Sequence, residues 1–295
     1  MNAVLTLGPH LYHWPANEWR DFYFRIADEA PVQSVCIGEI VCPKRAPFAL
    51  PDYNAVIARL RAAGKEVVLS TPALIVDGRD LALLRDALAM EEVLVEANDV
   101  AALALLAGRP HAIGPYINTY NRTTAARLAA GGATRITVPI ELPAEAIGLM
   151  AGLAAPEIEV QVFGRWPLAI SARCYHARAY GRTKDACLFA CGEDLDGLPV
   201  NTLDGESFLA VNGVQTLSAT YGCLLRELGE LKQAGVRRFR LSPQRTDMVA
   251  IARLYRDVLD DRLSAEEARR SVERLAGSVA LSNGFFHARE GARAV

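Results

Sequence analysis

The chain has 295 residues, 51% of them hydrophobic, and a formal net charge of −2, so it can bury a sizeable core and is too apolar for intrinsic disorder. Its basic residues are scattered, with only short runs at Arg237-Arg238 and Arg269-Arg270, which disfavours a nucleic-acid-binding face. The first residues lack the basic start of a signal peptide, and no apolar run is long enough for a membrane span. We therefore expect a cytoplasmic protein.

Short β-branched segments alternate with helical patterns along most of the chain. The pattern predicts strands at residues 3–7, 34–38, 66–70, 93–97, 112–117, 134–138, 158–163 and 237–241. Helices are expected between the first seven strands at about residues 17–29, 52–63, 80–89, 99–107, 123–130 and 144–153. Repeated strand–helix units indicate a parallel sheet buried on both faces, and eight strands with intervening helices favour a (β/α)8 TIM-barrel-like α/β fold. An open doubly wound sheet is the alternative, but no G-x-G-x-x-G follows a strand.

The alternation stops at Gly164. Residues 164–205 show little regular periodicity, and irregular segments of this length are usually functional or disordered. We expect one barrel-like domain over residues 1–295, with residues 164–205 as an insertion after the seventh strand. Beyond it the pattern predicts a strand at 208–212, a helix near 218–233 and a C-terminal helix, capped by Ser264 with Glu267 three residues later.

Four cysteines are placed so that they could meet. Cys42 follows the second strand, whereas Cys174, Cys187 and Cys191 lie within the insertion after the seventh. In a barrel both segments leave from the C-terminal rim of the strands, where sites are built. Clustered cysteines in a reducing compartment more often bind metal or react than form disulfides. Four thiolates match the ligand set of an iron–sulfur cluster, although their spacing matches no ferredoxin run.

Zinc is the main competing metal. Structural zinc sites usually use close cysteine pairs, and only Cys187 and Cys191 approach that spacing. The two other cysteines, Cys36 in the second strand and Cys223 in the predicted helix near 218–233, are interpreted as small buried hydrophobes. His176, two residues after Cys174, has the position to hydrogen-bond a cluster sulfur, but a surface histidine is the simpler interpretation.

Several polar residues are candidates for substrate binding at the same rim. Some follow predicted strands, others flank Gly213, and an arginine next to Cys174 could grip a carboxylate with two hydrogen bonds. Together they could bind a carboxylated or quinone-like ligand, and ordinary turn and capping chemistry is the alternative for each. The candidates are Glu39, Asn118, Asn121, Arg173, Asn212, Gln215 and Gln244.

The sequence resembles members of the collagenase-like peptidase family that act in ubiquinone (coenzyme Q) biosynthesis. The matching pieces run nearly end to end, and the spacing of Cys174, Cys187 and Cys191 is the most specific of them. Others are Leu7-Gly8-Pro9, Gly38-Glu39-Ile40-Val41-Cys42-Pro43-Lys44-Arg45, Asn118-Thr119-Tyr120-Asn121, Ser171-Ala172-Arg173-Cys174, Val211-Asn212-Gly213-Val214-Gln215-Thr216, Leu241-Ser242-Pro243-Gln244 and Asn283-Gly284-Phe285-Phe286.

This resemblance implies a [4Fe-4S] cluster held by Cys42, Cys174, Cys187 and Cys191, and a heterodimer with a related UbiU-like protein. It also implies oxygen-independent hydroxylation of the ubiquinone ring precursor, with prephenate as the source of oxygen and a lipid-binding accessory protein of the pathway as a further partner. Despite the family's name, the chain has no serine-protease elbow, H-E-x-x-H or Cys–His nucleophile motif. A metal-independent peptidase and a zinc-stabilised scaffold remain the alternative functions, and no catalytic residue is identified.

Overall fold

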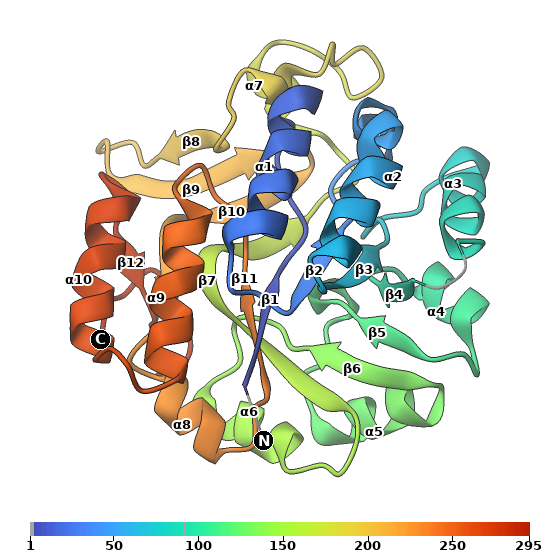
Figure 1. The fold of residues 1–295 in the computed structure, drawn as a ribbon. Helices are drawn as coiled ribbons and strands as arrows, with labels where there is room; N and C mark the ends of the chain where they lie inside the picture. The colour runs from blue at the N-terminus through green and yellow to red at the C-terminus, as the bar shows by residue number, and fades with distance from the viewer. Residues whose placement is uncertain (1–2, 91–92) are drawn as a thin grey trace.

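The computed structural model describes residues 3–90 and 93–295, and it confirms the predicted barrel. Eight parallel strands form a closed ring, because β11 pairs with β1 on one side and with β7 on the other (Figure 1). The strands of the ring are β1 (Val4–Leu7), β2 (Ser34–Ile37), β3 (Glu66–Ser70), β4 (Leu94–Ala97), β5 (His111–Ile113), β6 (Ala133–Thr137), β7 (Glu157–Ile170) and β11 (Arg238–Leu241).

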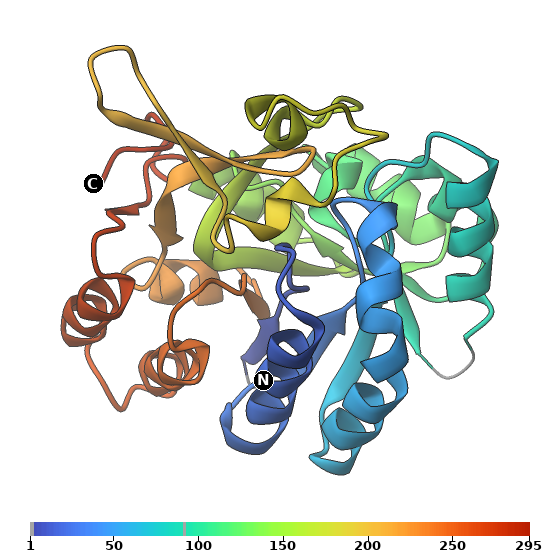
Figure 2. The ribbon, with the colours of Figure 1, turned by 90° about the horizontal axis from the view of Figure 1, so that it is seen from above.

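Helices surround this ring, as the view along the barrel shows (Figure 2). In α1 the buried side chains are Trp19, Tyr23, Ile26 and Ala27, at helical spacing, and α10 packs on α9. None of the helices in the described part of the chain is long and apolar enough to cross a bilayer. The helices are α1 (Ala16–Glu29), α2 (Ala46–Ala62), α3 (Gly78–Leu88), α4 (Val100–Leu106), α5 (Arg122–Ala130), α6 (Ala144–Ala151), α8 (Leu228–Gln233), α9 (Met248–Leu259) and α10 (Ala265–Ala276).

The segment after the seventh strand is more regular than expected. β7 continues beyond Gly164 to Ile170 and pairs antiparallel with β10 (Gln215–Cys223). β9 (Ser207–Asn212) and β8 (Leu198–Asn201) extend this sheet, which lies between the barrel and α7 (Tyr175–Ala179) in Figure 1. β12 (Leu281–Ser282) pairs with Tyr221 and Gly222 of β10, beyond the part of β10 that pairs with β9. The insertion is therefore built on strands that continue the barrel sheet.

Two predictions of secondary structure were wrong in part. The expected helix at 218–233 begins only at Leu228, because the preceding residues form β10, which places Cys223 in a strand. The expected strand at 112–117 ends at Ile113, and Pro115 starts a short 3-10 helix (Pro115–Ile117). In both segments tertiary pairing or proline geometry outweighs local propensity.

The barrel interior carries a network of buried charges. The guanidinium of Arg240 is paired with the carboxylates of Glu96 and Glu159, and the Arg240 Nε to Glu159 Oε2 distance is 2.8 Å. Thr137 Oγ1 donates to the same Glu159 oxygen at 2.7 Å, and Ser70 Oγ donates to Glu96. Burial alone would raise the pKa of Glu159, but Arg240 and Arg135 outweigh it and lower that pKa to about 2.

Replacing Arg240 by methionine should destabilise the barrel strongly. Two carboxylates would remain buried without their counter-charge, and the loss of one partner of a buried pair costs about 3–5 kcal/mol. Urea unfolding measures the change. Arg245→Met is the control, because its ion pair with Glu18 is exposed and should contribute less than about 1 kcal/mol. Equal losses in the two variants would contradict the assigned role of Arg240.

The Glu159 contribution to stability should disappear in acid. Its folded pKa, about 2, is below the ordinary value of 4.5, so the ionised form stabilises the fold above pH 4.5. This contribution, about 3 kcal/mol from the pKa difference, is lost as the pH falls from about 4.5 towards 2. The difference in urea midpoint between wild type and Glu159→Gln should therefore shrink over that interval. A difference that stays constant with pH would contradict the prediction.

Candidate metal centre

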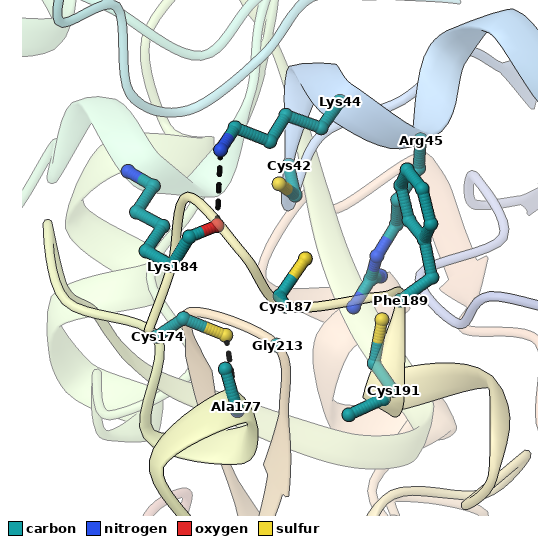
Figure 3. A pocket seen from close by; sticks show the side chains of 11 residues that line it. Cys42, Lys44, Arg45, Cys174, Ala177, Lys184, Cys187, Phe189, Cys191 and Gly213 are labelled. Atoms are coloured by element: carbon teal, nitrogen blue, oxygen red, sulfur yellow. Dashed lines mark hydrogen bonds between the residues drawn. The ribbon is translucent and has the colours of Figure 1, made fainter. Parts of the chain in front are cut away.

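All four predicted cysteines line one small pocket. Cys42 reaches it from the loop after β2, and Cys174, Cys187 and Cys191 reach it from the insertion (Figure 3). The remaining lining residues are Lys44, Arg45, Ala177, Lys184, Phe189, Ala190 and Gly213. The structure thus brings together two segments that lie far apart in the sequence, and the role of the thiols as ligands stays a prediction.

The loop that presents Cys42 is folded by its own residues. Gly38 leaves β2 at φ +127°, and a Cβ there would lie 2.2 Å from the carbonyl oxygen of Ser70, so only glycine fits. One carboxylate oxygen of Glu39, Oε1, then accepts hydrogen bonds from the backbone N–H groups of Val41 and Cys42, both at 2.9 Å. This predicted substrate residue therefore helps to position the first thiol.

The cysteines of the insertion are held by short turns. Cys174 caps α7, and its sulfur accepts a hydrogen bond from the backbone N–H of Ala177 at 3.4 Å. Leu188 and Phe189 both adopt left-handed backbone angles, and a short 3-10 helix (Ala190–Gly192) follows, so the chain turns sharply between Cys187 and Cys191. The contact from Ala177 thus fixes the position of the Cys174 sulfur.

Lys44 links the two segments of the site. Its ammonium group donates to the carbonyl oxygen of Lys184 at 3.0 Å, drawn as a dashed line in Figure 3, and pairs with Asp185 at 3.1 Å. Lys184 in turn donates to the carbonyl oxygen of Ala172 at 3.1 Å. These contacts hold the insertion against the loop after β2 without using any thiol.

Burial and one buried cation set the electrostatics of the thiols. Burial raises the pKa values of Cys42 and Cys191, and the nearby Arg45 guanidinium acts in the opposite direction on both. Arg45 lines the same pocket as both thiols. The sequence prediction overlooked this arginine, although it lies in the Cys42-Pro43-Lys44-Arg45 run that carried part of the resemblance.

The surface interpretation of His176 was wrong. Its side chain is fully buried, with Nε2 2.8 Å from Asp194 Oδ2 and Nδ1 3.1 Å from the carbonyl oxygen of Val211. Tyr180 stacks on the ring and donates to the same Asp194 oxygen. Both ring nitrogens are thus engaged by partners other than the cysteines, and the histidine ties α7 to β9 beneath the pocket.

Two of the predicted amide side chains lie beside the pocket, and a third lies apart from it. Asn212 is buried, accepts from Arg45 Nη2 at 2.9 Å and donates to the carbonyl oxygen of Leu11 at 2.7 Å. Gln215 donates to the hydroxyl of Tyr116 at 2.5 Å and accepts from Asn212 at 3.3 Å. Gln244 accepts from the hydroxyl of Tyr12 at 2.8 Å. All three have protein partners, so each contributes to packing around the site.

The remaining predicted substrate residues are not gathered at the thiols. Asn121 caps α5 by accepting from the backbone N–H of Thr124, and Arg173 is exposed. Asn118, in a left-handed conformation at φ 57°, lines a second pocket at the barrel mouth. That pocket lies between the loops after β3, β5 and β6 and the end of β7, and Glu141 and Tyr116 also line it. Sequence reasoning identified Asn118 but not these two neighbours.

The donor set suits a polynuclear cluster better than a single ion. No group of three His, Cys, Asp or Glu side chains in residues 3–90 and 93–295 is arranged to hold one metal ion. A single zinc needs four ligands within about 2.0–2.3 Å of one point, whereas an inorganic iron–sulfur core receives its thiolates from around its outside. Four cysteines around a pocket, one with a backbone N–H on its sulfur, fit the second arrangement.

Comparison with known proteins places the chain in a family. Among solved structures it resembles dihydropteroate synthase from Thermus thermophilus, with 14% identity, TM-score 0.46 and coverage of 88% of this chain and 93% of that chain. It also resembles thiamine phosphate pyrophosphorylase from Pyrococcus furiosus, with 12% identity, TM-score 0.42 and coverage of 93% and 98%. The sequence profile of peptidase family U32 matches residues 18–295. The chain therefore belongs to peptidase family U32.

Proposed function

We propose that the protein is an iron–sulfur subunit of an oxygen-independent hydroxylation system in ubiquinone biosynthesis, with a role like that of UbiV. The observation that carries the proposal is the single pocket lined by Cys42, Cys174, Cys187 and Cys191. Family membership agrees with the sequence resemblance on which the pathway assignment rests. In this proposal the four thiols hold a [4Fe-4S] cluster.

The cluster, when bound, would supply one-electron transfer. Because all four usual protein ligands would be cysteine, the cluster leaves no vacant iron for direct attack on substrate. The chain's own residues would do the rest: Glu39 and Ala177 orient Cys42 and Cys174 through backbone contacts, and Lys44 closes the insertion over the pocket. The proposed partners are a UbiU-like protein as heterodimer and a lipid-binding accessory protein of the pathway. Prephenate is the proposed oxygen source.

Two other functions give different results in the same assay. A zinc-stabilised scaffold would be colourless and contain stoichiometric zinc, and a peptidase in the sense of the family's name would cleave peptides after its metal is removed. The thiols lie around a pocket instead of converging on one point, which favours the cluster over zinc. No specific contact in the described residues favours a peptidase over these two.

Protein purified without oxygen should be brown and contain about four iron and four sulfide per chain. Cys174→Ala should lose most of both, because it removes one of the four thiolates. Cys223→Ala is the matched control, since this cysteine is buried in β10 against the Tyr255 hydroxyl and lies outside the pocket. Zinc in place of iron, or equal iron contents in the two variants, would contradict the proposal.

Removing the cluster should loosen the insertion. The thiolates would join β2 to the segment containing Cys174, Cys187 and Cys191, so a bound cluster restrains a segment that otherwise depends on contacts such as those of Lys44. Limited proteolysis is expected to cut the cluster-free protein within residues 171–192 at least tenfold faster than the loaded protein. Equal cleavage rates would mean that the insertion does not depend on the metal.

A further inference from the structure

Arg45 differs from the other buried arginines, Arg135, Arg165 and Arg240, because it forms no ion pair with a carboxylate in residues 3–90 and 93–295. Its side chain is 3% exposed, like that of Arg240, which is paired with two carboxylates. The buried carboxylate of Glu39 acts on Arg45 only from beyond ion-pair distance. A buried unpaired cation is costly in a folded protein, so its presence requires an explanation.

The neutral contacts of Arg45 leave part of the guanidinium unsatisfied. Nη1 donates to the carbonyl oxygen of Leu11 and Nη2 to Asn212 Oδ1, both at 2.9 Å, whereas Nε has no partner. These contacts place the group without neutralising it. Gly213 leaves room for it, because a Cβ at that position would lie 2.4 Å from Nη2.

The guanidinium faces the thiols. It lines the same pocket as all four cysteines (Figure 3). A [4Fe-4S] core bound by four thiolates carries a net negative charge, which becomes one unit more negative on reduction. A cluster held by these thiols would therefore lie against the guanidinium of Arg45.

We infer that Arg45 is the built-in counter-charge of the metal centre and raises the reduction potential of a cluster bound there. This inference rests on the proposed function, since it presupposes a cluster on the four cysteines. A fixed positive charge favours the more negative, reduced form, and burial strengthens that interaction because water does not screen it. Arg45 is a positioning residue in this account and is not a ligand.

The test compares Arg45→Gln with Arg45→Lys and with Arg245→Gln. Each protein is purified without oxygen, assayed for iron and sulfide, and titrated with dithionite and mediators, which add one electron per cluster. The electron paramagnetic resonance signal of the reduced cluster is the readout. Arg245 is the control because the same charge is lost outside the pocket, where the arginine is paired with Glu18 and its side chain is 46% exposed.

Arg45→Gln should lower the reduced-to-oxidised ratio at a fixed potential about tenfold, which is a downward shift of about 59 mV for a one-electron couple. Arg45→Lys, which keeps the charge, should recover most of the wild-type ratio, and Arg245→Gln should change it less than threefold. If Arg45→Gln fails to load, loading by Arg45→Lys still supports a requirement for charge.

Three results would overturn the inference. The first is an unchanged ratio in a loaded Arg45→Gln protein. The second is an equal effect of Arg45→Lys and Arg45→Gln on ratio or loading, because hydrogen-bond geometry and not charge would then explain it. The third is wild type without iron and sulfide, which refutes the proposed function as well. Only the first two results leave the proposed function intact, so the two failures are distinguishable.

Discussion

The continuity of β7 determines where the cysteines lie. This strand has 14 residues; its first part pairs with β11 inside the barrel and its second part pairs with β10 beyond the rim. Gly164, at φ +106°, lies where the two parts meet and packs closely against Ser242. Because one continuous strand serves both sheets, the insertion leaves the barrel in a fixed direction, and Cys174 follows four residues after the strand ends. The pairing of β7 within the sheet thus fixes the position from which Cys174 is presented.

The molecule contains two kinds of buried arginine, which differ in whether a carboxylate forms an ion pair with them. Arg240 is neutralised within the barrel by Glu96 and Glu159, so its charge has a structural partner. Arg45 forms no ion pair in the described part of the chain; it hydrogen-bonds neutral oxygens, and the Glu39 carboxylate acts on it from beyond ion-pair distance. Folding alone does not need an unpaired guanidinium at that place, because an apolar side chain would avoid the cost of burying it. The position of this charge beside the thiols agrees with the anionic cluster that we propose for the pocket.

Sequence patterns predicted the barrel and the meeting of the four cysteines in one pocket. They failed where contacts between distant segments determine the structure. Alternating strand and helix signals located the eight ring strands because each unit carries its own periodicity. The environment of His176 could not be deduced, since it depends on Asp194 and on a strand that is more than thirty residues away. Residues 218–223 were predicted to be helical because their local sequence does not reveal their pairing with β7. Arg45 follows Cys42 by three positions, but its burial depends on Asn212.

The same dependence on distant segments fixes an order of events during synthesis. A growing chain that has reached Cys191 already carries every thiol of the site, but it lacks Asn212 and Gly213, which hold and accommodate Arg45. It also lacks β11, which closes the ring beneath the site. Until about residue 241 has emerged from the ribosome, the thiols are present without the walls that enclose them. The pocket that encloses the four cysteines is therefore complete only after residue 241 has been made, and until then the thiols are more open to solvent and oxidants.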